Sequence, residues 1–268
     1  MVVDLFSYLF LSHLLSDFFL QTDGMLLSKR EKRLKGPAIY MHTIIVAALA
    51  WLFAWDVEFW FYALMIFLSH LLLDFAKIKC KERRFCTFVI DQMLHLAILA
   101  VMSYAFCQTH TWKVFSYGIF VFDWRVATLV SLFLFIMSPV NYMIQEALWR
   151  SGETDSDRPK DPYLLIGSGI GNVGDKSNFP RLENAGAMIG ALERGMAFFF
   201  VILGNYQAIG FIIAAKSILR FKESDQARAE YVLVGTLLSI IMSIIAGLCA
   251  SWILFDRKLL MDIGISSR

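Results

Sequence analysis

The chain has 268 residues, of which 58% are hydrophobic and 18% are charged, and its net charge is +2. Soluble domains carry about 25% charged and about 45–50% apolar residues, so this composition excludes an ordinary water-soluble protein. The small net charge gives no sign of a nucleic-acid partner. Because a membrane span needs roughly 20 mostly apolar residues, long runs such as 59–73 and 126–137 predict an all-α polytopic membrane protein with about seven or eight transmembrane helices.

The predicted helices follow one another with few long gaps. They cover residues 2–21, 37–55, 58–77, 85–107, 125–149, 184–203, 207–221 and 230–255. The first run lacks a basic leader and a small-residue cleavage site, so it reads as a span and not as a signal peptide. Residues 114–124 are apolar but too short to span, and their aromatic side chains suit the membrane interface.

Four regions are expected along the chain. They are a repeated four-helix His/Asp membrane domain at 1–110, an interfacial segment and fifth helix at 111–149, a cytoplasmic polar loop at 150–183, and C-terminal membrane helices at 184–268. Of the 25 Lys and Arg residues, 20 follow the first, third, fifth and seventh helices or open the sixth. Basic residues favour the cytoplasmic side, so these loops are predicted to be cytoplasmic.

A nine-residue motif occurs twice in the N-terminal half. Residues 10–18 read FLSHLLSDF and residues 67–75 read FLSHLLLDF, identical at eight of nine positions. Each copy lies in a helix predicted to run inward, and each is followed by a basic loop and a further helix. The N-terminal half is therefore interpreted as an internal repeat of two helical hairpins, related by an axis along the membrane normal.

Histidines and aspartates gather near the predicted cytoplasmic ends of these four helices. Residues four apart share a helix face, which pairs His13 with Asp17, His70 with Asp74, and Asp91 with His95. With His42 at the same depth, seven candidate metal ligands result: His13, Asp17, His42, His70, Asp74, Asp91 and His95. Ionisable groups inside a bilayer cost free energy and are usually functional.

Imidazole and carboxylate together suit a divalent metal, with zinc or manganese favoured over others. Within this set Asp17, Asp74 and Asp91 are the candidate catalytic residues, and some carboxylates are expected to orient a histidine instead of binding metal. Two alternatives stay open at this point. The polar groups either form only interhelical hydrogen bonds, or two histidines bind a haem, against which the carboxylates argue.

The C-terminal half carries a second group of charged residues. Arg194, Lys216 and Arg220 are candidates for binding a phosphate or lipid headgroup, and Glu193 and Glu230 are candidates for balancing their charge. The alternative is that the long basic side chains simply extend to lipid phosphates.

The stretches HLLSDFFLQTD, HLLLDFAK and DQMLH, with His42 between the first two, resemble a bacterial family of multi-pass membrane proteins. That family is known as domain of unknown function 3307, and the likeness covers roughly residues 1–107. The segments GALER, KSILRF and AEYVLVGTLLS are similar to a C-terminal extension of some members. The resemblance implies a protein of the bacterial inner membrane and supplies no activity.

Three functions remain in competition. The first is a hydrolase or transferase with a cytoplasmic-side His/Asp metal site, acting on a lipid or phosphorylated amphiphile. The second is a transporter of metal ions or of a proton-coupled solute, and the third is a non-catalytic assembly or interaction protein of the membrane. The expected partners are membrane lipids and the amphiphilic substrate, and assembly with copies of itself stays open.

Overall fold

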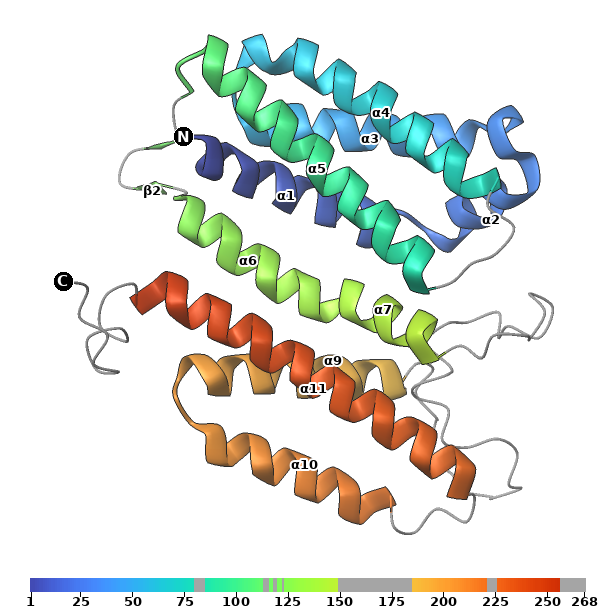
Figure 1. Ribbon diagram of the computed structural model, residues 1–268, viewed down its shortest axis with the longest axis vertical. Helices are drawn as coiled ribbons and strands as arrows, with labels where there is room; N and C mark the ends of the chain where they lie inside the picture. Colours follow the sequence, from blue (N-terminus) through green and yellow to red (C-terminus); the bar gives the residue numbers. More distant parts are fainter. Residues whose placement is uncertain are drawn as a thin grey trace. The chain divides into compact units, whose positions relative to one another are not determined.

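The computed structural model of the protein describes residues 1–79, 85–112, 116–117, 120–121, 123–148, 185–220 and 226–255. These residues are almost entirely helical and divide into two compact units, Met1–Leu134 and Phe135–Arg268 (Figure 1). The expected all-α class is therefore confirmed. The predicted polar loop at 150–183 lies outside the described residues, and so does the basic turn at 80–84.

The first unit is a bundle of four long helices. The four are α1 (Val2–Phe18), α3 (Pro37–Ala54), α4 (Trp60–Lys79) and α5 (Phe85–Thr109). The unit also contains α2 (Asp23–Lys32), most of α6 (Trp124–Met137) and short 3-10 turns at Arg33–Lys35 and Val57–Phe59. Helix α1 packs against α3 and α5, and α4 packs against the same two helices, which closes the four-helix bundle (Figure 1).

Local sequence explains the tight connection between α3 and α4. Helix α3 begins at Pro37, where a proline costs no hydrogen bond because the first turn has none to lose. It ends before Trp55, whose backbone is left-handed with a φ of 51°. The Asp56 side chain then accepts a hydrogen bond from the Glu58 amide at 2.9 Å and caps the next turn. The two helices consequently run antiparallel.

The bundle has an apolar interior and an apolar exterior. Leu5, Leu9, Ala50, Phe59, Ile66 and Phe106 lie inside and are at most 2% exposed. Large side chains on the outside, including Trp51, Leu72, Val101 and Tyr104, are 45–66% exposed. Soluble monomers rarely expose so much contiguous apolar surface. The outward faces therefore contact membrane lipid.

Five helices of the described part of the chain are long and apolar enough to cross a membrane. They are Pro37–Ala54, Val57–Lys77, Phe85–Thr109, Trp124–Ile144 and Leu233–Phe255. The chain is accordingly a membrane protein. The expectation of seven or eight spans stays a prediction, because α1 has 17 residues and the apolar helix Tyr206–Ile218 is shorter still.

Two local expectations were wrong, and a third segment, the predicted interfacial one, has local structure that was not predicted. The predicted loop after the first helix contains α2, in which a short apolar run, 25–27, precedes the basic residues Lys29, Arg30 and Lys32. The predicted fifth helix is broken at Ser138, since Pro139 lacks the amide hydrogen that a continuous helix needs. Within the predicted interfacial segment, Ser116–Tyr117 pairs antiparallel with Phe120–Val121 as a two-residue β-ladder, β1 with β2.

The second unit is built on its longest helix. Helix α11 (Gln226–Phe255) packs against α9 (Ala185–Ile202) and α7 (Pro139–Leu148), and α10 (Tyr206–Arg220) packs against α9. Helices α9 and α11 lie close together at Gly247, where an added Cβ would lie 2.8 Å from the Val201 Cβ. Only glycine fits this crossing.

We expect Gly247→Ala to lower the stability of the second unit by about 1–3 kcal/mol, because the new methyl group forces α9 and α11 apart. The matched control is Gly210→Ala in α10, where an added Cβ meets nothing within 4 Å. Alanine favours a helix over glycine by about 1 kcal/mol, so the control should not destabilise. Thermal unfolding in detergent checks both, and equal melting temperatures would contradict the close approach.

Candidate metal centre

The seven predicted ligands lie at one end of the first unit's bundle. This is the end where α1 and α4 finish and where α3 and α5 begin. Asp17, His42, Asp74 and Asp91 are all within about two helical turns of it. His13, His70 and His95 lie one turn further in, because each is four residues from its aspartate. Helix direction alone thus gathers the set.

The side chains of this cluster are buried. His13, His42, His70 and His95 are 1–4% exposed, and Asp74 and Asp91 are 8% exposed. Burying ionisable groups in a low-dielectric interior is costly unless they are paired or bind a metal. The cluster therefore has to balance its charge internally or with a bound cation.

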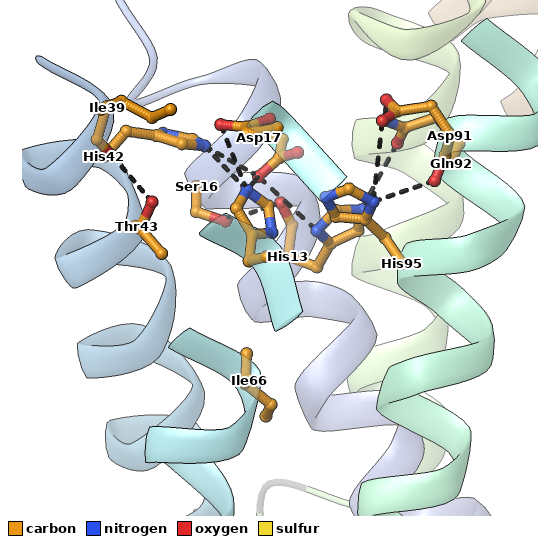
Figure 2. Close-up of polar contacts among 12 residues, drawn as sticks. His13, Ser16, Asp17, Ile39, His42, Thr43, Ile66, Asp91, Gln92 and His95 are labelled. Atoms are coloured by element: carbon orange, nitrogen blue, oxygen red, sulfur yellow. Dashed lines mark hydrogen bonds and ion pairs between the residues drawn. The ribbon is translucent and has the colours of Figure 1, made fainter. Parts of the chain in front are cut away.

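Asp17 is the centre of the cluster. Its Oδ1 lies 3.6 Å from His13 Nδ1 and 3.6 Å from His42 Nε2 (Figure 2). It also lies 3.8 Å from His70 Nε2. The His42 and His70 Nε2 atoms are 3.1 Å apart. Three imidazoles from three different helices thus turn a nitrogen toward one carboxylate oxygen.

The other two aspartates each have a lysine. Lys29 Nζ lies 2.5 Å from Asp74 Oδ2, and Lys77 Nζ lies 2.5 Å from Asp91 Oδ2. Within the described residues, Asp17 forms ion pairs with histidines and with no lysine or arginine. Asp17 is thus the one carboxylate of the three whose charge no fixed cation balances there.

A chain of hydrogen bonds sets the orientation of His13. The Gln92 amide nitrogen donates to Asp91 Oδ2 at 3.2 Å, which turns Gln92 Oε1 toward His13 Nε2 at 3.4 Å (Figure 2). An amide oxygen only accepts, so His13 Nε2 carries the hydrogen. His13 Nδ1 then carries a lone pair that faces a lone pair of Asp17 Oδ1 at 3.6 Å.

His95 is oriented in a similar way. Its Nδ1 lies 2.9 Å from the Asp91 backbone oxygen, and because a carbonyl only accepts, Nδ1 carries the hydrogen. The His95 Nε2 lone pair is buried and has no hydrogen-bond partner among the described residues, and the buried His42 Nδ1 atom has none there either. His95 lines a small cavity with His13 and His70, whose rings lie 5.3 and 4.2 Å from its own.

The geometry around Asp17 suits a divalent metal. Two sets of three residues each bring their ligand atoms to within 4.8 Å of one another. The first set is His13, Asp17 and His70, and the second is His42, His70 and Asp74. Zinc ligands at 2.0–2.2 Å in a tetrahedron are about 3.3–3.6 Å apart. The nitrogen–oxygen and nitrogen–nitrogen separations of 3.1–3.8 Å around Asp17 bracket that range.

Sequence reasoning missed three residues of the site. Lys29, Lys77 and Gln92 hold Asp74, Asp91 and His13 in place. Lys77 and Gln92 could have been found, because Lys77 lies three residues after Asp74 and Gln92 directly follows Asp91. Lys29 carried no such signal. It lies in a helix that was not predicted, and it is only 6% exposed.

The charged residues predicted in the C-terminal half are only partly brought together. Lys216 forms an ion pair with Glu193. The side chains of Arg220 and Glu230 lie outside the described residues. Arg194 is 3% exposed and donates to the Met137 carbonyl at 3.0 Å and toward Ser239 Oγ at 3.4 Å, while its Nε has no hydrogen-bond partner among the described residues.

The role of Arg194 follows from the break between α6 and α7. In a continuous helix the Asn141 amide would donate to the Met137 carbonyl, but here it donates to Ser138. A buried carbonyl without a donor is costly, and the Arg194 guanidinium supplies one. The contact occupies a guanidinium N–H group that would otherwise be available to bind a phosphate.

The family model described as protein of unknown function (DUF3307) matches residues 5–122, and it confirms the family resemblance. It covers α1 to α5 and thus the whole His/Asp cluster. No curated protein and no solved structure matches the chain.

We expect Arg194→Lys to destabilise the second unit by about 1–3 kcal/mol, because a lysine keeps the charge but cannot reach both Met137 and Ser239. Thermal unfolding in detergent measures the loss. Arg125→Lys serves as the control, since Arg125 is an exposed residue whose guanidinium lies 5.7 Å from the Trp124 ring. An unchanged melting temperature for Arg194→Lys would show that this bridging contact is not needed.

Proposed function

The chain belongs over residues 5–122 to the DUF3307 family of proteins of unknown function, and we propose that it is a membrane-embedded, metal-dependent hydrolase. One observation carries the proposal. Of the three aspartates in the cluster, Asp17 lacks a lysine partner among the described residues, and three imidazole nitrogens surround its partly buried carboxylate at 3.6–3.8 Å. A divalent cation would balance that charge.

The residues proposed to hold the ion are Asp17, His13 and His70, with His42 as a fourth candidate. Their donor atoms are those that zinc and manganese accept. His13 is already held by Gln92 in the tautomer that leaves Nδ1 free, and such outer partners are typical of metal-binding histidines. Asp74 and Asp91 are not proposed as ligands in the native protein, because each carboxylate is already paired with a lysine. Their proposed role is to hold the neighbouring histidines in place.

The chemistry proposed for the ion is activation of a water molecule. A bound zinc lowers the pKa of its water toward neutrality. The cavity lined by His13, His70 and His95 lies beside the ligands, and the free Nε2 of His95 lies there as a proton acceptor. His95 is therefore the proposed general base, held in orientation by the Asp91 backbone oxygen.

The proposed substrate is a phosphorylated amphiphile or a lipid of the inner leaflet of a bacterial inner membrane. The cluster lies at the bundle end from which the Lys- and Arg-rich segments emerge, and the positive-inside rule favours the cytoplasmic side for these segments. The two copies of the motif in α1 and α4 each place a histidine and an aspartate there, in keeping with a repeat of two hairpins. Arg194, Lys216 and Arg220 remain a proposed headgroup contact.

We expect the purified chain in detergent to hold about one zinc or manganese ion. Asp17→Asn, His13→Ala and His70→Ala should each lower metal content, because each removes a ligand. The control is His110→Ala, which alters a histidine at the other end of α5 that contacts Glu58 at 3.3 Å. Elemental analysis after dialysis measures the content, and hydrolysis of phosphorylated lipids measures the activity. Full metal content in Asp17→Asn would contradict the proposal.

Ion transport is the second candidate, and the burial of the cluster favours it. With all four of its histidines at most 4% exposed and a small cavity beside them in the described part of the chain, the cluster suits a bare ion better than a bulky substrate. Liposomes containing the protein decide between the two. Metal uptake without lipid turnover would support transport, whereas turnover without uptake would support the hydrolase.

A further inference from the structure

Lys29 is the least expected residue of the cluster. It comes from α2, which packs against α3, and its ammonium group is buried. Its Nζ lies 2.5 Å from Asp74 Oδ2. Lysine is almost never buried unless it is paired, so this contact accounts for its position.

The Asp74 carboxylate belongs to the second set of candidate ligands, with His42 and His70. The His70 Nε2 atom lies 4.0 Å from Asp74 Oδ2 and 3.8 Å from Asp17 Oδ1. One imidazole nitrogen has one lone pair to give. The two sets that share His70 therefore compete for it, and the ion goes to the set whose carboxylate is free.

The charges of the cluster also favour a metal at Asp17 over one at Asp74. With neutral histidines, the described residues of the cluster hold three carboxylates and two ammonium groups, so one negative charge is left over among them. A divalent ion carrying a hydroxide balances that charge. A second divalent ion beside Lys29 would leave two extra positive charges in a buried site, which is unfavourable.

We propose that His42, His70 and Asp74 form a second, latent divalent-cation site, and that the Lys29 ammonium group fills it and so directs the metal to Asp17. The inference rests on the proposed function, since it assumes that the cluster binds metal. It adds a role for a residue that binds neither metal nor substrate. Removing Lys29 frees a carboxylate beside two imidazoles, which is a complete three-ligand set.

A rescue experiment tests the latent site with Zn²⁺ alone as the probe, measured by calorimetry on the full chain in detergent. Asp17→Asn should weaken Zn²⁺ binding by at least about 100-fold, because it removes a ligand and the loss of an outer partner alone costs about 10–100-fold. Adding Lys29→Met should restore binding to within about tenfold of the native chain, because Asp74 replaces Asp17 as the carboxylate ligand.

Two controls locate the rescue. Asp17→Asn with Lys77→Met frees Asp91, which lies outside both ligand sets, and should not restore binding. Adding Asp74→Asn to the rescued variant should abolish binding again. If Lys29→Met does not fold, Lys29→Gln removes the charge and keeps a hydrogen bond to Asp74. A Zn²⁺-dependent rise in melting temperature provides a second readout for each variant.

The outcomes separate this inference from the proposed function. If Asp17→Asn loses Zn²⁺ and no Lys29 variant restores it, the latent site is wrong and the metal at Asp17 stands. If Asp17→Asn binds as tightly as the native chain, both assignments are wrong. If the native chain binds no Zn²⁺, the proposed function fails. Uptake by Lys29→Met alone would then still support the latent site, and no uptake would overturn it.

Discussion

The Asp17 carboxylate is the constraint on which the arrangement of the first unit depends. An unpaired carboxylate inside a helical bundle costs several kcal/mol, and the described part of the chain offers it imidazoles in place of a lysine. The histidines of α1, α3 and α4 converge because this oxygen is their common neighbour (Figure 2). The rest of the cluster supports that convergence, through Gln92 on His13 and through lysines that occupy the other two carboxylates.

Pairing with lysine distinguishes three otherwise similar aspartates. Asp17, Asp74 and Asp91 each lie four residues from a histidine, and nothing in that spacing distinguishes them. The distinction comes from Lys29 and Lys77, which neutralise two of them. Among the described residues, the two lysines leave one position in the cluster, at Asp17, where a divalent cation would balance the charge. Whether the chain hydrolyses a substrate or moves an ion, that place is where the chemistry would occur.

The second unit balances its buried charges without histidine. Lys216 is paired with Glu193, and Arg194 donates to the carbonyl that the break at Pro139 leaves free. These contacts explain why charged residues occur inside apolar helices, since each satisfies a group that would otherwise be unpaired. Two of the residues predicted to bind phosphate, Arg194 and Lys216, thus already have partners within the protein. Only an anion that competes with those partners would reach them.

The sequence by itself determined the helical membrane architecture and the gathering of the seven candidate ligands at one end of the bundle, because both follow from hydrophobic runs and from helix direction. Periodicity put His13 and Asp17 on one face, as it did for His70 and Asp74. Only the tertiary structure decided which carboxylate stays without a lysine. Lys29 reaches Asp74 from α2, across 45 positions of the sequence, and lies in a segment that the pattern of charges assigned to a loop. Contacts between helices depend on how side chains pack, and no spacing along one helix records them.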